Sequence, residues 1–483
     1  MNEEAEKSEE QISNDPLARF IARLRNIFAQ YEDRIQALRD IIDTTTPYAS
    51  ALDEPDTSLA QLSAAVRKVP KERIPQVQEL FRRMRNKEIT YRQMLQELFE
   101  NFEREGWNYD LIVALHESQM RQPRLPTLRN SLLTTAVATF EVVVANVATE
   151  FYHFRPEALE MNARDREKEF SLRELKQFET INDAIDYTIS KRVESLMFGS
   201  IADWRRFFND ALKIDLSDLT IDWPEFQEIL LRRHVIVHNG GRASRRYVTQ
   251  VKQSDPNAKV TEGDVLDCEQ DYLEYALDHL LVAGTLLVAA VTVKFSRADA
   301  LSSKLNMLTY SLLRNGRLEA VKRLCKFGMS MPIDQDEILI FKVNMALAVK
   351  AQEGIEGISK DITSWDVSAL SDVFKLAKAS LLGRLDEAFK LLPPLVERGQ
   401  IGAEELLEWP LFSSMRKDRR FTPIMMPKIE EAGIAHLDDK WVVLNTKTGV
   451  VHKPGCRLAK SGERMYIDAP EVQAARRCRI CWR

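Results

Sequence analysis

Two arginines and two histidines are gathered at the end of an otherwise apolar stretch, LLRRHVIVHNGG, at residues 230–241. Arg233 and His238 have four residues between them, which places them about 140° apart around an α-helix. Arginine stays charged and its planar fork donates two hydrogen bonds to a phosphodiester, whereas histidine exchanges a proton near neutral pH. Histidine can take the proton of a ribose 2′-hydroxyl or return one to the leaving 5′-oxygen. These side chains could therefore cleave RNA without a metal ion.

The residues around this stretch predict that it occupies the last turns of a helix. Asp222 is suited to the N-cap, Pro224 to the first turn, and Gly240 to the C-terminal stop. A helix C-terminus repels anions, so basic side chains must supply the attraction for a phosphate. The flanking sequence is rich in such side chains. We expect the RNA-binding residues to be Arg232, Arg242, Arg245 and Arg246.

The segment RRHVIVHNGG resembles the signature of the HEPN superfamily (higher eukaryotes and prokaryotes nucleotide-binding), whose ribonuclease members carry Arg-x4–6-His. Arg233 matches the arginine and His238 the histidine, while His234 matches the polar residue that follows the arginine, and Asn239 a common following position. The resemblance implies a bundle of long helices that dimerises so that two motifs form one cleft. It also implies a toxin or antiphage effector, in which His238 is the general acid/base and Arg233 stabilises the phosphorane. His234 and Asn239 would orient the site or the substrate.

Three other interpretations of this segment stay open. His234 and His238 are spaced i, i+4, as in half of a metal site, although the nearby sequence offers no third ligand. The arginines could be surface residues and His238 a hydrogen-bonded core residue. Finally, the chain could be a non-catalytic helical adaptor that dimerises through a HEPN-like domain and binds nucleic acid or protein partners.

The C-terminal sequence carries the strongest chemical signal in the chain. His452 and Cys456 form an H-x3-C pair, Cys478 and Cys481 form a C-x2-C pair, and 21 residues separate the two pairs. This spacing is typical of a tetrahedral Zn²⁺ site, and four protein ligands leave no position for a reactive water. A module of about forty residues has little core, so the metal would contribute folding energy. We predict a structural zinc site and no metal in catalysis, with a redox Cys-x2-Cys pair as the alternative.

The pattern HKPGCR…CRIC is similar to the metal-binding module of the Ada family of DNA-repair proteins. That module has four cysteines and uses one as a methyl acceptor, so His452 argues against DNA repair by methyl transfer here. The resemblance implies nucleic-acid contact through the basic residues of the module, and Trp482 could stack on a base. These basic residues are Lys453, Arg457, Lys460, Arg464, Arg476, Arg477, Arg479 and Arg483. The alternative is a zinc-stapled tail that docks on its own protein.

Composition predicts a mainly α, multi-domain helical protein with a small C-terminal zinc-binding β/α module. The 483 residues include only 17 Gly and 18 Pro, and so few helix breakers favour long helices over a β-rich fold. We expect an acidic disordered tail at 1–15, a helical domain at 16–124, a HEPN-like ribonuclease domain at 125–298, tetratricopeptide-like helices at 299–430 and the zinc-binding module at 438–483.

The expected helical repeats are indicated by two similar segments, NGRLEAVKRL and LGRLDEAFKLL. Their glycines, Gly316 and Gly383, are 67 residues apart, which is about two periods of the 34-residue tetratricopeptide repeat. Any stack of paired helices would fit nearly as well. By analogy with other toxins, we expect a protein trigger to act through these helices.

The sequence indicates a cytoplasmic protein that makes no contact with a membrane. Its acidic start lacks the features of a signal peptide. The apolar run Leu280–Val293 is too short to cross a bilayer, and Glu141 and Asn146 interrupt a second run. The cysteines show no paired spacing in the first 450 residues, which suits a reducing compartment. The expected partners are an RNA substrate (tRNA or mRNA), a second copy of the chain and the protein trigger.

Overall fold

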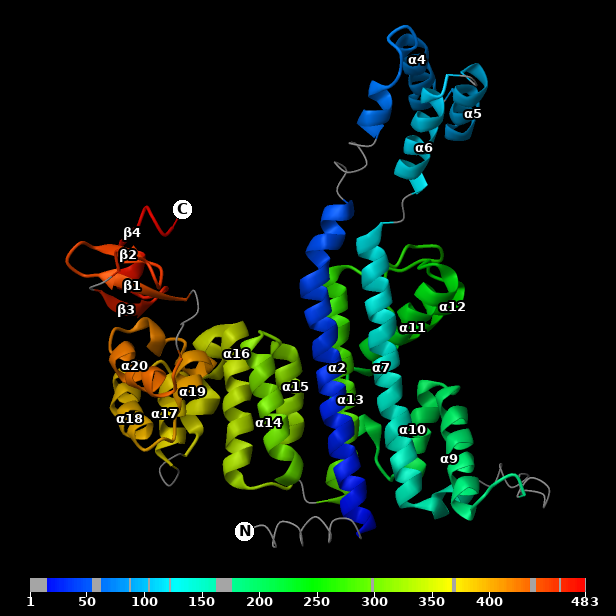
Figure 1. Ribbon diagram of the computed structural model, residues 1–483. Coiled ribbons are helices and arrows are strands. Elements are labelled where there is room, and N and C mark those ends of the chain that lie inside the picture. Colours follow the sequence, from blue (N-terminus) through cyan, green and yellow to red (C-terminus); the bar gives the residue numbers. More distant parts are fainter. Residues whose placement is uncertain are drawn as a thin grey trace. The chain divides into compact units, whose positions relative to one another are not determined.

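The computed structural model describes residues 15–53, 62–86, 88–102, 105–120, 123–161, 176–296, 299–366, 371–434, 440–459 and 462–482. This part of the chain is mainly helical, with a small four-stranded sheet near its C-terminal end (Figure 1). The predicted fold class, a mainly α multi-domain protein with a small C-terminal module, is confirmed. Residues 1–14 of the expected acidic tail (1–15), together with Lys460 and Arg483, lie outside the described residues.

The chain divides into two compact units, and each is assembled from separate segments of the sequence. The first, which we call the motif unit, comprises Ile27–Asn146 and Asp222–Gly284. The second, which we call the C-terminal unit, comprises Met1–Asn26, Val147–Ile221 and Thr285–Arg483. The domain boundaries expected from the sequence stay predictions.

Two long helices, α2 (Pro16–Asp53) and α13 (Gln270–Phe295), each contribute residues to both units, and within the motif unit buried contacts bind them to each other. The Tyr31 hydroxyl donates to the Leu280 carbonyl at 2.5 Å, and the Tyr31 ring packs directly against Gly284. About two turns further along α2, the buried Arg39 forms ion pairs with Glu274 and Asp278, at 2.8 and 2.5 Å. The periodicity of each helix predicts a buried face, but not which distant helix covers it.

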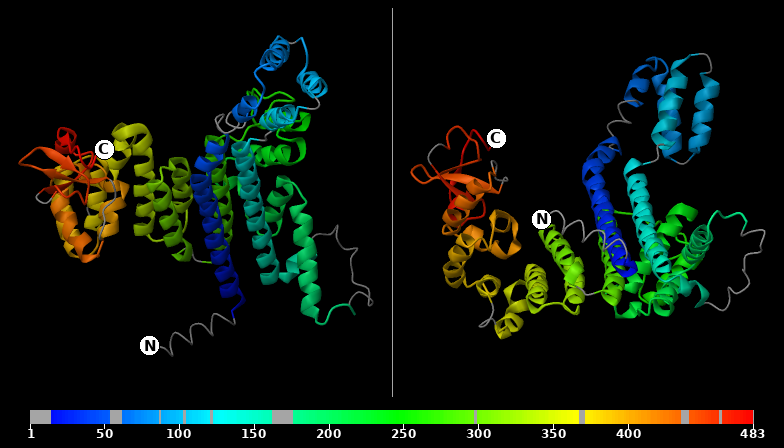
Figure 2. Two further views of the ribbon diagram at one scale, coloured as in Figure 1. Left: turned by 45° about the horizontal axis from the view of Figure 1, so that its top comes forward. Right: turned by 60° about the horizontal axis from the view of Figure 1, so that its bottom comes forward.

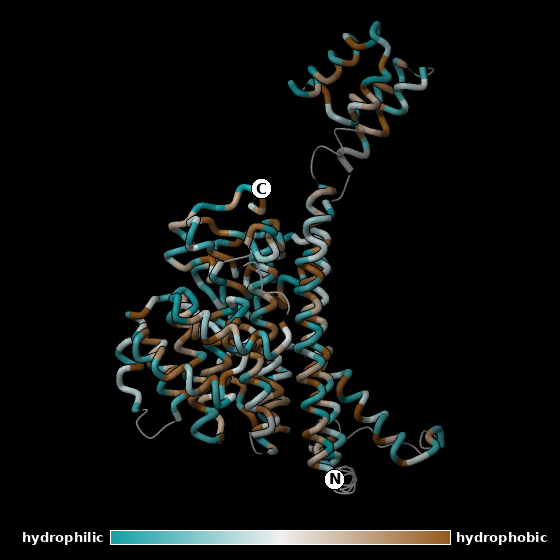
Figure 3. The backbone as a smooth tube through the Cα atoms, turned by 60° about the vertical axis from the view of Figure 1, so that its left-hand side comes forward, coloured by the Kyte–Doolittle hydropathy of each residue, from teal (hydrophilic) through white to brown (hydrophobic). Residues whose placement is uncertain are grey.

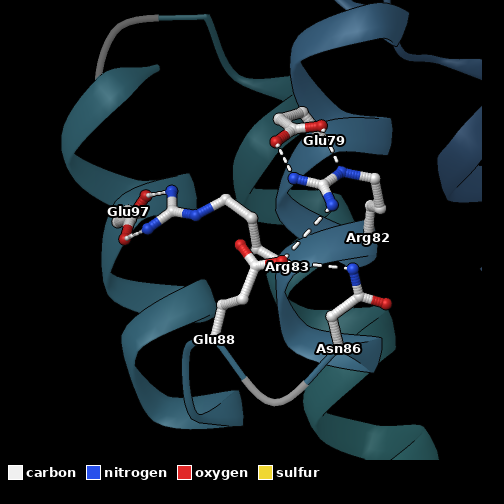
Figure 4. Close-up of polar contacts among 6 residues, drawn as sticks. All are labelled: Glu79, Arg82, Arg83, Asn86, Glu88 and Glu97. Atoms are coloured by element: carbon white, nitrogen blue, oxygen red, sulfur yellow. Dashed lines mark hydrogen bonds and ion pairs between the residues drawn. The ribbon is translucent and has the colours of Figure 1, made fainter.

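Three shorter helices of the motif unit, α4 (Ile74–Arg85), α5 (Tyr91–Asn101) and α6 (Trp107–Met120), share a hydrophobic cluster of their own. Charged side chains link α4 to α5 and to the loop between them (Figure 4). Arg83 of α4 pairs with Glu97 of α5 at 2.7 Å, and Arg82 pairs with Glu79 and Glu88 at 2.7 and 3.3 Å. Pairs with this much exposure add little stability, so the apolar cluster is what holds the three helices together.

The helix that carries the arginine–histidine motif, α11 (Trp223–Asn239), begins and ends where the sequence predicts. The Asp222 carboxylate accepts a hydrogen bond from the Glu225 amide at 3.4 Å, and Gly240 ends the helix with a left-handed φ of 59°. The Phe226 ring packs edge-on against Phe140 of α7 (Arg124–Phe154), at 4.8 Å between centroids. The next helix, α12 (Arg245–Ser254), packs against α11 through a small cluster that includes Val235 and Tyr247.

The C-terminal unit contains most of the remaining helices, and Figure 2 shows α14 to α18 lying beside one another in succession. The turns that end α14 and α17 have the same geometry. Gly316 and Gly383 have left-handed φ values of 70° and 69°, and the next residue in each donates its amide to a carbonyl five residues back, at 2.9 Å. The two similar sequence segments therefore form equivalent helical hairpins. The α-helices are α9 (Ile181–Met197), α10 (Ile201–Asp210), α14 (Asp299–Arg314), α15 (Leu318–Gly328), α16 (Gln335–Ser364), α17 (Asp372–Leu381), α18 (Leu385–Glu397), α19 (Ala403–Glu408) and α20 (Phe421–Glu431), with 3-10 turns at Pro156–Met161, Leu216–Asp218, Pro410–Phe412 and Met415–Lys417.

The small sheet has the strand order β3-β1-β2-β4. Strand β1 pairs antiparallel with β2 and β3, whereas β2 pairs parallel with β4. A hairpin joins β1 to β2, and Gly449 closes it with a left-handed φ of 62° and a 2.8 Å hydrogen bond to the Asn445 carbonyl. The elements are β1 (Trp441–Asn445), β2 (Val450–His452), β3 (Glu463–Tyr466), α21 (Pro470–Gln473) and β4 (Arg476–Arg477).

Two helices, α7 and α13, are long and apolar enough to cross a membrane when judged by length and composition alone. The run Leu280–Val293 by itself is too short to cross a bilayer, but the whole helix α13, of which it is a part, is long enough. In α13, 78% of the most apolar window is buried inside the protein, and in α7 the share is 50%. The protein's own packing therefore covers most of the apolar part of α13. Figure 3 shows hydrophobic and hydrophilic residues alternating along most other helices, which is the pattern of amphipathic helices.

Candidate functional site

The two histidines of the motif lie together on the exposed side of α11. His234 and His238 are both exposed, and their ring centroids are 4.5 Å apart. They come together because residues four apart lie one above the other on a helix. Asn239, the last residue of the helix, is also exposed. Two imidazoles and one amide are thus accessible to a ligand at the end of α11.

Arg233 points to a different neighbour, the helix α7. Its Nη2 atom pairs with a carboxylate oxygen of Glu141, and both side chains are partly buried. Burial raises the pKa of Glu141, and the positive charge of Arg233 opposes that rise. The ion pair therefore fixes the guanidinium beside the histidine-bearing face of α11.

Glu141 is a site residue that the sequence did not identify as one. It lies 92 residues before Arg233, so no local spacing connects the two. The available signal was a lone carboxylate within the apolar run TTAVATFEVVVANVATEF. A buried carboxylate needs a partner, and Arg233 is that partner.

Arg232 is held on the opposite side of α11, inside a polar network. Its Nε donates to Glu228 at 2.8 Å, and its guanidinium lies 3.8 Å from the centroid of the Tyr272 ring. The same Glu228 carboxylate accepts hydrogen bonds from the Tyr247 and Tyr272 hydroxyls, at 2.5 and 2.6 Å. These contacts join α11 to α12 and α13, so the structure does not bring Arg232 together with the other predicted RNA-binding arginines.

Arg242, Arg245 and Arg246 are exposed beyond the end of α11. Burial lowers the pKa of His234, and the positive charges of His238, Arg246 and Arg233 lower it further. Arg246 therefore acts electrostatically on His234, and the imidazole stays neutral to a lower pH than usual. Unlike Arg232, these three arginines form no ion pair among the described residues, and they remain accessible to phosphate.

A second candidate site lies in the C-terminal unit. One ligand atom from each of His452, Cys456, Cys478 and Cys481 can be chosen so that all lie within 4.8 Å of one another. His452 ends β2, whereas Cys478 follows β4 and donates its amide to the Val451 carbonyl at 2.9 Å. The parallel pairing of β2 with β4 thus brings together ligands that are distant in the sequence.

The chemistry of these four residues fits a metal ion such as zinc. Ligand atoms around a tetrahedral zinc are separated by about 3.5–3.8 Å, as follows from its usual bond lengths, so small movements would close the site. His452 Nδ1 is buried and has no hydrogen-bond partner within the described part of the chain. Hydrogen bonds from the amides of Cys481 and Ile480 lower the pKa of Cys478, which favours the thiolate that a metal requires.

Trp482 packs on the core of the small sheet rather than standing away from it. Its indole Nε1 donates to the Val451 carbonyl at 3.2 Å. The guanidinium of Arg477 and the ammonium of Lys453 lie 4.7 and 5.6 Å from a ring centroid of the indole. Basic side chains surround this module, and its exposed members are Lys453, Arg457, Arg464, Arg476, Arg477 and Arg479.

Comparisons of the chain with family models, with curated proteins and with solved structures find no match. The resemblance to the HEPN superfamily therefore rests on the residues of the motif alone. The same is true of the resemblance between the C-terminal module and the Ada family.

Proposed function

We propose that this protein is a metal-independent endoribonuclease of the HEPN type, acting as a toxin or antiphage effector. It would cleave RNA to leave 2′,3′-cyclic phosphate and 5′-hydroxyl ends. The observation that carries the proposal is the exposed His234–His238 pair, next in sequence to an arginine that an ion pair fixes in place. No residue in this set requires a metal ion.

The proposed reaction moves one proton off the nucleophile and one onto the leaving group. The ribose 2′-oxygen attacks the adjacent phosphorus, the bond to the 5′-oxygen breaks, and His238 is the general acid/base. The lowered pKa of His234 keeps its ring neutral, so that it can accept a hydrogen bond from the 2′-hydroxyl. Asn239 would orient the substrate by hydrogen bonding.

Arg233 would stabilise the negative charge that develops on the phosphorane oxygens. Arginine has five N–H donors, and the ion pair with Glu141 engages the Nη2 nitrogen. Glu141 is a positioning residue in this scheme because it contacts Arg233 and not the substrate. A fixed donor costs no reorganisation at the moment of reaction.

Three arginines beyond the motif, Arg242, Arg245 and Arg246, would bind the phosphates that flank the cleaved bond. All three are exposed, and their release of counterions would make RNA binding depend strongly on salt. Arg232 would contribute indirectly, by holding α11 against α12.

We further propose that the C-terminal group His452, Cys456, Cys478 and Cys481 binds Zn²⁺ as a structural ion. A second copy of the chain would complete the cleft, as the family resemblance implies. The helical hairpins of the C-terminal unit would receive the protein trigger that relieves a restrained enzyme.

The test is RNA cleavage in EDTA by the full-length protein. Purified wild type, His238→Ala and His116→Ala are incubated with total tRNA and with mRNA. His116 is a matched control because it is an exposed histidine on α6. We expect cleavage by wild type and by His116→Ala, and none by His238→Ala. Equal cleavage by all three proteins would remove His238 from the mechanism.

A further inference from the structure

A groove in the motif unit has room for a small ligand. It lies between α11, α12 and the first turns of α13, and its volume is about 320 Å³. Sites for small molecules in proteins begin at about 300 Å³. The side chains that line it include Gln227, Leu231, Gln250, Tyr272 and Tyr275.

The groove follows the face of α11 that carries Gln227, Leu231 and Arg232, and along the helix the histidines continue the row of Gln227 and Leu231. Gln227, Leu231, His234 and His238 follow one another at spacings of four, three and four residues, which is one stripe of a helix. At a rise of about 1.5 Å per residue, Leu231 and Gln227 lie about 5 and 10 Å along the helix from His234. A phosphate and the base of an adjacent nucleotide in one RNA strand are separated by distances of this order.

Helix α12 also reaches from the histidine pair to the groove. Its Arg246 acts electrostatically on His234, and Gln250, one turn later, lines the groove. Figure 1 shows α11 and α12 as neighbouring helices, which agrees with their shared apolar cluster. A phosphate held at Arg246 and the histidines would therefore have its nucleoside beside Gln250.

The side-chain oxygen of Gln250 has no hydrogen-bond donor opposite it among the described residues. This Oε1 atom is shielded from solvent and accepts no hydrogen bond from the described residues, which is a costly state for an amide oxygen. Gln250 is one of the side chains that line the groove, so a ligand bound there would be close enough to supply the missing donor. The amide of glutamine matches the edge of adenine, because it can accept from the N6 amino group and donate to N7.

The aromatic wall of the groove suits a flat base. Tyr275 is 37% exposed, and Tyr272 lies next to it with its ring held by Arg232. Stacking on an aromatic ring stabilises any base, so the two tyrosines alone would not distinguish one base from another. The choice between bases would come from the amide of Gln250.

We propose that this groove binds the adenine base of a nucleotide next to the scissile phosphate. The inference rests on the proposed ribonuclease function and assigns that enzyme a preference for adenosine beside the cleaved bond. Uridine carries no exocyclic amino group, so it would leave the Gln250 oxygen without a donor.

Equilibrium binding tests the groove without any cleavage. Adenosine 5′-monophosphate and uridine 5′-monophosphate are titrated into the full-length protein by calorimetry, with wild type, Gln250→Leu and Gln253→Leu. Gln253 is the matched control because it is exposed on α12 and does not line the groove. We expect wild type and Gln253→Leu to bind the adenosine nucleotide about tenfold more tightly, which corresponds to one hydrogen bond. Gln250→Leu should bind both nucleotides equally.

Equal binding of the two nucleotides by wild type, or an unchanged preference in Gln250→Leu, would overturn the proposal. If Gln250→Leu does not fold, Gln250→Met, which is closer to glutamine in shape, replaces it. Mapping the cleavage sites in a defined RNA separates this inference from the ribonuclease function. Cleavage without a preference for adenosine would overturn the base site and leave the enzyme standing. Adenosine-selective binding without any cleavage would support the base site and count against the enzyme.

Discussion

Three consecutive residues of α11 face three different surroundings. Arg232 is bound by Glu228 and Tyr272, Arg233 is bound by Glu141, and His234 is exposed beside His238. Each residue of a helix is rotated by about 100° from the one before it. Consecutive basic residues in the sequence therefore do not form one basic surface. The sequence identifies the residue types at this site, but long-range packing decides which of them meet a ligand.

The first residue-scale prediction concerns the titration of His234. Arg246→Gln should raise the pKa of His234 towards its ordinary value, because it removes one of the positive charges that lower it. Arg245→Gln should leave the pKa unchanged and serves as the control. The measurement is an NMR pH titration of labelled histidines. An unchanged His234 pKa in Arg246→Gln would mean that Arg246 does not act on the imidazole.

The second prediction concerns the pair formed by Glu141 and Arg233. Glu141→Gln removes the charge that fixes Arg233, so the cleavage rate should fall at least about tenfold, which is the loss of roughly 1.4 kcal/mol of stabilisation. Glu150→Gln, also on α7, is the control and should cleave like wild type. A full rate in Glu141→Gln would show that Arg233 needs no positioning partner.

At the scale of whole helices, local chemistry predicts the ends of α11 and long-range contacts decide its neighbours. The Asp222 cap and the Gly240 stop could be predicted because capping depends on a few adjacent residues. The hydrogen bond from Tyr31 to Leu280 joins residues 249 positions apart. Such pairing has no local signature, and periodicity shows only that a buried face exists.

A prediction at this scale uses the close approach of α2 to Gly284. A Cβ atom at Gly284 would lie within 2.6 Å of two Tyr31 ring atoms and 2.9 Å of the hydroxyl. Gly284→Ala should therefore destabilise the protein by about 1–3 kcal/mol, although alanine normally favours a helix over glycine. Urea unfolding measures the change. In a Tyr31→Leu background the cost of Gly284→Ala should shrink, and an equal cost in both backgrounds would contradict the packing described.

At the scale of the molecule, the four candidate metal ligands could be predicted because their spacing is close to that of known tetrahedral sites. The pairing of β2 with β4 that brings them together required the structure. The helices of both units have apolar cores of their own, whereas the small sheet has a core of only a few residues. Metal should therefore matter for the C-terminal module and much less for the helices.

Removal of metal tests whether the C-terminal module depends on a metal ion while the helices do not. Prolonged chelation, or Cys478→Ser, should expose residues 440–482 to proteolysis while the helical circular dichroism signal changes little. The metal content of the untreated protein is measured in parallel. A module that stays protected after complete removal of metal would show that the four ligands do not hold it together.

The most direct test of the central claim is the chemistry of the RNA ends. Fragments made by the full-length protein in EDTA are treated with polynucleotide kinase and labelled ATP, without prior phosphatase. The 2′-hydroxyl mechanism predicts 5′-hydroxyl ends that label at once and 2′,3′-cyclic phosphates at the other ends, and neither with His238→Ala. Fragments with 5′-phosphate and 3′-hydroxyl ends would contradict the 2′-hydroxyl mechanism and the role of the histidine pair.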